Sequence, residues 1–194
     1  LVHNGDLMLP EEAGLPARIV ERVYGKLTDW AIRMSSGVII QTKDYARQSK
    51  LLAKHEDKWR VVMPLFDLPK VKTVDVMAFR KKWGLEKGVS IGFSGRFVEE
   101  KGVAYLLEAI EILIKEYPNM QIVMAGDYKI GYEKYWQKIE RLVRRYKEYI
   151  TLLGLVDNPY TMAVFYKSID ILVQPSQSDC FPSSQVEALL SGTP

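Results

Sequence analysis

Two carboxylates near the end of the chain could hold a ligand that carries hydroxyl groups. Asp179 lies in the loop ‘SDCFPS’, and Glu187 follows after seven intervening residues. Pro182 suits the first turn of a helix and Gly192 its end, which predicts a helix from about 182 to 191. Carboxylates accept hydrogen bonds from sugar hydroxyls, so the pair could hold the ribose and the hexose of a nucleotide sugar. Two other interpretations remain open, namely exposed surface charges and the acid pair of a glycoside hydrolase.

A second loop, ‘SGRFVEEKG’, could hold a diphosphate. Gly95 allows the backbone to approach a ligand, and Arg96 and Lys101 place two cations at the mouth of the following helix. The amino-terminal amides of that helix add partial positive charge. The loop has no G-x-G-x-x-G pattern, and Lys101 is followed by Gly102, so it is not a Walker A loop. A solvated turn decorated with charges is the alternative.

The elements that position these loops alternate between strand and helix from about residue 37 onward. This order predicts an α/β fold, a Rossmann-like doubly wound parallel sheet in which βα loops carry the ligands. The expected strands are ‘GVIIQT’, ‘KWRVVMP’, ‘VSIGFSG’, ‘QIVMAG’, ‘ITLLG’ and ‘IDILVQP’. The expected helices are the amphipathic run 15–34, ‘KDYARQSKLLAK’, ‘VAYLLEAIEILIKEY’, ‘YWQKIERLVRRYKEY’, ‘TMAVFYKS’ and the final helix.

The stretch ‘LFDLPKVKTVD’, with Pro64 before it and Pro69 within it, shows neither the helical nor the strand period. It predicts an interdomain linker over 64–75, because proline fixes its own φ and favours extended geometry before it. The domains expected on either side are a partial amino-terminal segment, 1–63, and a second domain, 76–194. The chain begins at Leu1 rather than Met and ends on ‘SGTP’ where another strand would follow, so we expect a fragment, truncated at its carboxyl end.

The helix ‘YWQKIERLVRRYKEY’ offers two faces. Its apolar positions predict a core face: Tyr132, Tyr135, Trp136, Ile139, Val143 and Tyr146. Its cations form either a solvated face or a contact with an anionic membrane: Lys134, Lys138, Arg141, Arg144, Arg145 and Lys147.

Composition excludes several classes of protein. With 47% hydrophobic and 26% charged residues, the chain is expected to fold rather than to be disordered. One cysteine, Cys180, excludes an internal disulfide and favours the cytoplasm, and no apolar run is long enough for a membrane span. The net charge of +3 does not by itself imply nucleic acid, and we expect none as a partner. No His/Asp/Glu cluster has ligand spacing, so no metal is expected.

Taken together, the stretches ‘GRFVEEKG’, ‘IVMAGD’, ‘LLGLV’, ‘YKSIDILVQPS’ and ‘SDCFPSSQVEALLSGTP’ resemble the GT-B glycosyltransferases of family 4, the group 1 transferases. The last stretch resembles their E-x7-E motif, with Asp179 where the motif has its first Glu. The resemblance covers nearly the whole chain, with ‘VVMP’ similar to the strand before the family's interdomain hinge. It implies retaining transfer of a hexose from a UDP- or GDP-linked donor, without a metal cofactor, to a saccharide or lipid-linked acceptor.

The resemblance also implies a role for each matching residue. Arg96 and Lys101, after Gly95, would hold the diphosphate, and Glu187 would hold the ribose. Asp179 would contact the donor hexose with help from the backbone near Cys180 and Phe181. The remaining positions are Leu155 and Val156 in the base pocket and His3 near the reaction centre. Segment 1–63 would be the end of the acceptor domain. A non-catalytic nucleotide-sugar-binding lobe and a GT-B sugar-phosphate enzyme remain alternatives.

Overall fold

A computed structural model describes residues 1–3, 5–7, 14–128, 130 and 134–194. The chain divides into two compact units. The first comprises Leu1–Leu65 with the tripeptide Asp179–Phe181, and the second comprises Phe66–Ser178 with Pro182–Pro194. Each unit has its own hydrophobic core residues.

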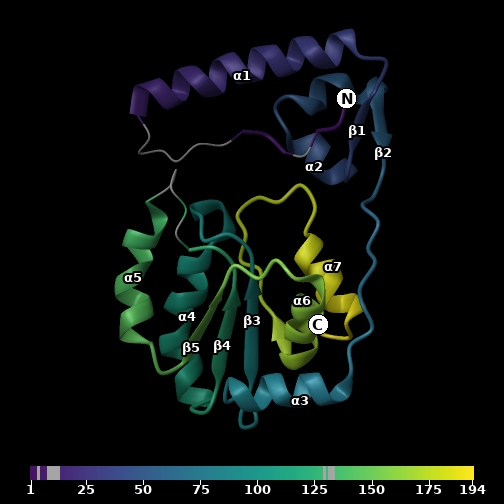
Figure 1. Cartoon of the computed structure of the whole chain (residues 1–194). Helices are drawn as coiled ribbons and strands as arrows, with labels where there is room; N and C mark the ends of the chain where they lie inside the picture. The colour runs from purple at the N-terminus through teal and green to yellow at the C-terminus, as the bar shows by residue number, and fades with distance from the viewer. Residues whose placement is uncertain (4, 8–13, 129, 131–133) are drawn as a thin grey trace. The chain divides into compact units, whose positions relative to one another are not determined.

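The second unit is built on a four-stranded parallel sheet in the order β5-β4-β3-β6 (Figure 1). Its strands are β3 (Ser90–Ser94), β4 (Gln121–Ala125), β5 (Ile150–Gly154) and β6 (Ile171–Leu172). Its helices are α3 (Thr73–Lys82), the 3₁₀ turn η3 (Glu99–Lys101), α4 (Val103–Glu116), α5 (Tyr135–Arg145), α6 (Pro159–Ser168) and α7 (Ser183–Leu190). The parallel strands are joined by helical crossovers, as their alternation in the sequence predicts.

Both faces of this sheet are buried, which explains why β4 is a continuous apolar run. Ile122 and Met124 pack into one core with α4 and α5, whereas Val123 and Ala125 pack into a second core with α6 and Leu85. Successive side chains of a strand point to opposite faces, so a strand covered on both sides has no polar alternation. The helices of the second unit in Figure 1 therefore cover both faces of this sheet, with α4 and α5 on one face and α6 and α7 on the other. The predicted doubly wound α/β architecture is confirmed.

The predicted core face of α5 is also confirmed where the structure describes it. Tyr135, Ile139, Val143 and Tyr146 are buried, and Trp136 packs against the same core. Tyr132 lies outside the described residues.

Helix α3 was not predicted. It begins at Thr73, inside the segment 64–75 expected to be a linker, and the division between the units falls between Leu65 and Phe66. No residue of α3 is fully buried, and Val74 and Met77 are exposed, so its sequence carries no helical apolar stripe.

The first unit contains a two-stranded parallel sheet, β1 (Val38–Ile40) and β2 (Trp59–Val61), extended by a bridge from Val2 to Ile39. Its helices are α1 (Gly14–Met34), α2 (Lys43–Gln48) and the 3₁₀ segment η2 (Leu52–Lys58). The predicted helix over 43–54 is thus replaced by a shorter helix, a break at Ser49 and η2. Its core consists of Ile32, Val38, Ile40, Ala46, Leu52 and Trp59.

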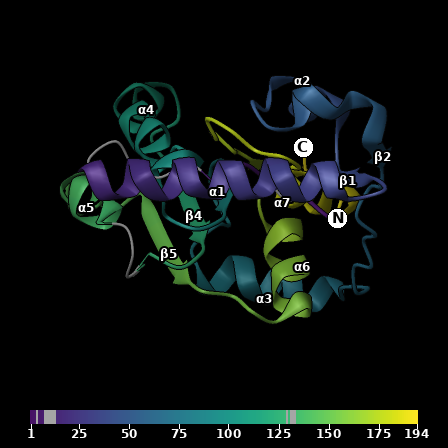
Figure 2. The ribbon, with the colours of Figure 1, turned by 90° about the horizontal axis from the view of Figure 1, so that it is seen from above.

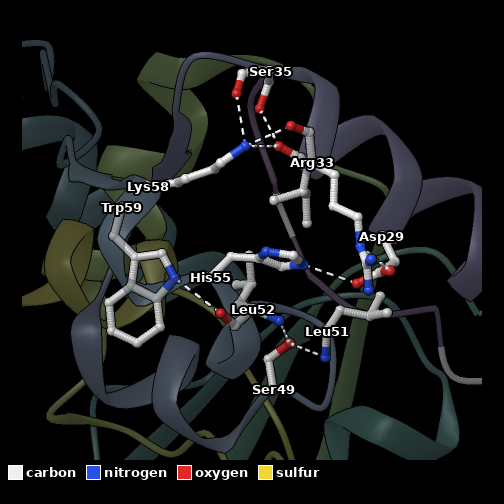
Figure 3. A network of polar contacts seen from close by, with 10 residues as sticks. Asp29, Arg33, Ser35, Ser49, Leu51, Leu52, His55, Lys58 and Trp59 are labelled. Carbon is white, nitrogen blue, oxygen red and sulfur yellow. Dashed lines mark hydrogen bonds and ion pairs between the residues drawn. The ribbon is translucent and has the colours of Figure 1, made fainter.

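Polar contacts join α1 to η2 (Figure 3). The Lys58 ammonium donates to the carbonyls of Ile32, Arg33 and Ser35 at 3.0, 2.6 and 3.0 Å, at the carboxyl end of α1, where the Ile32 carbonyl also accepts from the Ser35 hydroxyl at 2.8 Å. His55 Nε2 lies 2.8 Å from Asp29 Oδ1, and this hydrogen bond lowers the pKa of Asp29. One ammonium group therefore binds three carbonyls at the end of α1.

The apolar stripe of α1, which is one long helix in Figure 2, is exposed. The stripe comprises Leu15, Ile19, Val20, Val23, Tyr24, Leu27, Trp30 and Met34, with exposed fractions from 41% to 78%. Ile32 is the residue that α1 contributes to the core of the unit. The predicted helix is confirmed, but its apolar face does not bury itself in this unit. In the described part of the chain, no helix is both long and apolar enough to cross a membrane.

Candidate functional site

The carboxyl ends of β3, β4 and β5 meet through backbone alone. The amide of Gly95 donates to the carbonyl of Ala125 at 2.9 Å, and the amide of Gly126 donates to the carbonyl of Gly154 at 2.8 Å. A Cβ at Gly126 would lie 1.8 Å from the carbonyl oxygen of Gly95, so a side chain cannot be added without moving the strand ends. Ligands of open parallel sheets bind beyond the carboxyl ends of the strands. We call these joined strand ends the backbone floor of the candidate site.

The loop after β3 is anchored by one buried aromatic residue. Phe97 is 1% exposed, its amide donates to the carbonyl of Asp127 at 3.0 Å, and its ring packs edge to face on Phe93 with 5.7 Å between centroids. The neighbouring Arg96 is exposed. The anchor therefore holds the loop in place, and Arg96, directly after Gly95 of the backbone floor, stays exposed.

Lys101 ends the loop, half-buried, just before α4. Gly102 follows in the left-handed conformation with φ 65°, and a Cβ there would lie 2.0 Å from the carbonyl oxygen of Pro175. The amide of Ala104, in the first turn of α4, donates to the hydroxyl of Tyr135 at 2.9 Å. One amide of this helix terminus is thus already hydrogen-bonded inside the protein. For binding an anion, α4 can therefore offer the field of its dipole and its other amino-terminal amides.

Glu187 lies half-buried on α7 and is held by a chain of hydroxyl groups. The hydroxyl of Tyr166 donates to Glu187 Oε2 at 2.8 Å and lies 3.2 Å from Ser94 Oγ. The side-chain amide of Gln174 donates to the carbonyl of Ser94 and, at 2.8 Å, to Ser184 Oγ. These contacts tie the end of β3 to α7, which places the carboxylate beside the same end of the sheet as Arg96.

The Tyr166 hydroxyl keeps its proton at neutral pH. Burial raises the pKa of Tyr166, the Ser94 hydroxyl lowers it, and the hydrogen bond and charge of Glu187 raise it further, with a large net increase. The hydroxyl therefore acts as a donor to the Glu187 carboxylate throughout the physiological range.

The two residues predicted for a base pocket follow β5. Leu155 is 71% exposed, and Val156 is half-buried against the core that contains Phe165 and Tyr166. Gly154, before them, has a left-handed φ of 72°. Val156 is therefore fixed by packing, and Leu155 offers an apolar surface to solvent or to a ligand.

His3 belongs to the first unit, at the carboxyl end of the short extended segment beside β1. Its Nε2 lies 3.0 Å from Asp6 Oδ1, which also accepts from Ser49 Oγ at 2.9 Å, and the amide of Asp6 donates to the hydroxyl of Tyr45 at 2.7 Å. Burial acts to raise the pKa of Asp6, but the hydrogen bonds from His3 and Ser49 outweigh it and lower that pKa. His3 is buried and oriented rather than an exposed terminal residue.

The tripeptide Asp179–Phe181 also groups with the first unit. Within that unit, the Cys180 thiol donates to Gln41 Oε1 at 3.1 Å, and the Cys180 carbonyl accepts from Thr42 Oγ1 at 3.2 Å. Two hydrogen bonds therefore fix Cys180 within the first unit.

The structure gathers some of the predicted site residues into one unit and separates others from them. Gly95, Arg96, Lys101, Leu155, Val156 and Glu187 lie in the second unit, and His3, Asp179, Cys180 and Phe181 lie in the first. The sequence reasoning missed Ser94, Tyr166 and Gln174, which hold Glu187 and α7. Tyr166 is far from Glu187 in the sequence and lies within a predicted helix, so no local spacing could have found the contact.

The cations of α5 are partly neutralised by acids. Lys138 lies 3.5 Å from Glu99, Arg144 lies 2.8 Å from Glu140, and Arg145 lies 3.8 Å from Glu111. These ion pairs favour the interpretation of a solvated face, because exposed pairs of this kind cancel much of the field that an anionic surface would respond to.

Within the described ranges, no group of three or more His, Cys, Asp or Glu residues is arranged to hold a metal ion. The hydroxyl of Ser176, in the loop after β6, is buried and has no hydrogen-bond partner among these residues. A buried hydroxyl without a partner costs about 1–3 kcal/mol, so a polar ligand atom reaching Ser176 would gain from it.

Comparison with known families decides what kind of protein carries this site. The family described as “Glycosyl transferases group 1” matches residues 88–194, more than half of the chain. The chain belongs to the group 1 glycosyltransferases. The matched range contains the backbone floor, Arg96, Lys101 and Glu187.

Individual relatives agree with the family. The 2-deoxystreptamine glucosyltransferase of Streptomyces kanamyceticus is 25% identical over 201 residues, covering 100% of this chain and 50% of that protein. The alpha-monoglucosyldiacylglycerol synthase of Streptococcus pneumoniae is 27% identical over 132 residues, covering 66% of this chain and 29% of that protein. The chain spans about half the length of the first relative and less of the second.

The fold of this glycosyltransferase chain recurs in a solved structure. HepE from Anabaena, crystallised in complex with UDP-glucose, matches with a TM-score of 0.77 at 20% identity, over 100% of this chain and 51% of its own. The expected GT-B type of α/β fold is thereby confirmed.

Proposed function

We propose that this chain is the donor-binding part of a retaining glycosyltransferase that moves a hexose from a UDP- or GDP-sugar to a saccharide or lipid-linked acceptor. The observation that carries the proposal is the joint position of Arg96, Lys101 and Glu187 at the carboxyl end of one parallel sheet. Two cations and one carboxylate suit the two parts that every nucleoside diphosphate has, an anionic diphosphate and a ribose diol.

The diphosphate is held by Arg96 and Lys101. A guanidinium donates two parallel hydrogen bonds to phosphate oxygens, and an ammonium adds a compact charge. The dipole of α4 points its positive end toward the same place. As the bond to the sugar breaks, negative charge grows on the leaving diphosphate, and the fixed cations stabilise that charge without a metal ion.

The ribose is held by Glu187, whose carboxylate accepts from the ribose hydroxyls, and the base lies against Leu155 and Val156. Asp179 contacts the hexose, with Cys180 and Phe181 contributing backbone amides. His3 acts near the reaction centre. The named relatives support a sugar-transfer role, since one is a glucosyltransferase and HepE was solved with UDP-glucose.

Calorimetric titration of this chain with UDP, GDP and ADP, each alone and as the hexose conjugate, tests the proposal. We expect saturable binding of one nucleotide series. Arg96→Ala removes charge-assisted hydrogen bonds worth about 1.5–3 kcal/mol and should weaken that binding roughly 10- to 100-fold. Arg141→Ala, an exposed cation of α5, is the charge-matched control, and Cys180→Ala should also have little effect.

Three outcomes contradict parts of the proposal. Binding to no nucleotide overturns the donor role of this chain. Equal losses of nucleotide affinity in Arg96→Ala and Arg141→Ala show a nonspecific charge effect and overturn the assignment of Arg96 to the diphosphate. In the intact protein, a bound donor that is never hydrolysed or transferred identifies a binding lobe rather than a transferase, and inversion at the transferred carbon refutes retention.

A further inference from the structure

Tyr166 is a buried residue whose only polar side-chain atom, its hydroxyl, contacts Glu187 of the candidate site. It is 1% exposed, and its ring packs beside Phe165 with 5.3 Å between centroids, in the core that also holds Val123 and Ala188. A ring enclosed in this way has one orientation. Its hydroxyl is therefore a fixed point, set by the core rather than by the loops around the site.

The direction of the hydrogen bonds follows from the chemistry of the three groups. An ionised carboxylate only accepts, so the single proton of the Tyr166 hydroxyl goes to Glu187 Oε2, 2.8 Å away. The Ser94 hydroxyl, 3.2 Å away, can then donate to the Tyr166 oxygen. Among the described residues, Tyr166 is the hydrogen-bond partner of Glu187, so the carboxylate has one oxygen engaged and Oε1 available to a ligand.

We propose that Tyr166 is a positioning residue for the ribose-binding carboxylate. By holding Oε2, it fixes the rotamer of Glu187 and presents Oε1 to the ribose hydroxyls. The inference rests on the proposed function, because it takes Glu187 to be the group that binds ribose. Tyr166 does not touch the donor, and its effect passes entirely through Glu187.

This arrangement couples the two halves of the donor site. Ser94 is the last residue of β3 and precedes Gly95 and Arg96, so the chain Ser94–Tyr166–Glu187 runs from the strand end that carries the diphosphate loop to the ribose carboxylate. A preorganised carboxylate loses less side-chain freedom on binding than a mobile one. The contribution of Tyr166 should therefore appear only when the ligand has ribose hydroxyls.

The test uses UDP and 2′,3′-dideoxy-UDP, or the corresponding GDP or ADP pair if the titration above selects that base. Binding is measured for the unmodified chain, Tyr166→Phe, Glu187→Gln and the double variant. Without the hydroxyl of Tyr166, the Glu187 side chain loses more freedom when the ligand binds, so Tyr166→Phe should weaken UDP binding about tenfold. Binding of the dideoxy analogue should be nearly unchanged, and the double variant should be no weaker than Glu187→Gln alone.

Tyr146→Phe is the matched control. Tyr146 is also buried in the second unit, and its hydroxyl donates to a carboxylate, Glu111 Oε2, at 3.3 Å. It lies at the end of α5, and its substitution should leave the affinities for both nucleotides unchanged. Thermal unfolding of both Phe variants checks that they fold. Should Tyr166→Phe not fold, Ser94→Ala removes the hydroxyl that contacts Tyr166. It should give a smaller loss of affinity that again depends on the ribose hydroxyls.

The outcomes separate the inference from the proposed function. If the unmodified chain binds UDP and its dideoxy analogue equally, or binds neither, the ribose role of Glu187 is wrong and the inference fails with it. If Glu187→Gln loses the preference for ribose but Tyr166→Phe keeps it, the proposed function stands and the inference is overturned. Equal losses for both nucleotides in Tyr166→Phe also overturn it, because they indicate a general structural effect.

Discussion

Replacing Gly102 by alanine tests whether the start of α4 is held against the loop after β6. Gly102 has φ 65°, and a Cβ there would lie 2.0 Å from the carbonyl oxygen of Pro175 and 2.9 Å from its carbonyl carbon. Both atoms belong to the backbone, so the clash cannot be relieved by a side-chain rotation. The hydrogen bond from the amide of Gln177 to the carbonyl of Glu100, at 2.8 Å, holds the same two segments together.

Two costs add in Gly102→Ala. A left-handed conformation costs a residue with a Cβ about 1–2 kcal/mol, and forcing backbone apart in a packed region costs about 1–3 kcal/mol more. The matched control is Gly84→Ala, also in the second unit, with φ 68° and nothing within 4 Å of the added Cβ. It carries the first cost alone, so the difference between the two variants isolates the steric cost.

The assay is thermal unfolding followed by circular dichroism. For a chain of this size, each kcal/mol lowers Tm by about 2–4 °C. We expect Gly84→Ala to lower Tm by about 4 °C and Gly102→Ala by about 10 °C, from the two costs above. Gly102→Ala should also weaken nucleotide binding through displacement of Lys101, and Gly84→Ala should not. Equal shifts in Tm would refute the close approach of Gly102 and Pro175.

Two further changes test other contacts. Burial acts to raise the pKa of Asp170, but the hydrogen bonds from Ser90 and the charge of Arg80 outweigh it and lower that pKa. The ionised carboxylate therefore stabilises the fold above the unfolded pKa of about 4, and this stabilisation is lost as the pH falls through the lower, folded pKa. Urea unfolding between pH 6 and pH 3 should therefore show a steeper loss of stability in the unmodified chain than in Asp170→Asn, and parallel curves would contradict this. Lys58→Met leaves three carbonyls at the end of α1 without their cation and should lower the free energy of unfolding by about 1–2 kcal/mol in urea, whereas the exposed Lys54→Met should change it by less than about 0.5 kcal/mol.

The parallel sheet of the second unit could be predicted because each of its main strands is a largely apolar run next to turn residues, buried in β3 and β4 and half-buried in β5. The run ‘QIVMAG’ corresponds to β4 (Gln121–Ala125), and ‘ITLLG’ corresponds to β5 (Ile150–Gly154). A strand that is covered on both faces is a continuous run of hydrophobic residues, and such a run can be recognised in a single sequence. The same reasoning overestimated β6, which pairs only over Ile171–Leu172.

Helix α3 could not be predicted for the opposite reason. It packs on α6 mainly through Phe79, which contacts Phe165 with 6.5 Å between ring centroids, and its other apolar residues do not form a stripe. The hydroxyl of Tyr160 bonds to Asp75 on its first turn. These are tertiary contacts between residues far apart in the sequence, and the hydrophobic periodicity of a single segment does not predict them.

The candidate site was predictable only in part. Arg96, Lys101 and Glu187 could be found because charged residues in βα loops stand out against apolar strands. Tyr166 could not, since a tyrosine in the middle of a helix is ordinarily a core residue, and only the fold reveals that its hydroxyl meets Glu187. The charged residues of the candidate site can thus be found locally in the sequence, whereas the residues that hold them cannot.

The backbone floor has a consequence for engineering the donor preference. Gly95, Gly126 and Gly154 join three strands without any side chain, so the floor has the same shape whatever residues occupy the loops above it. A combinatorial library that diversifies Leu155 and Val156 while keeping these glycines would sample variants of the proposed base pocket above an unchanged backbone floor. Randomising Gly126, by contrast, would fill the library with clones that cannot close the sheet, because every other amino acid brings a Cβ to within 1.8 Å of a carbonyl oxygen.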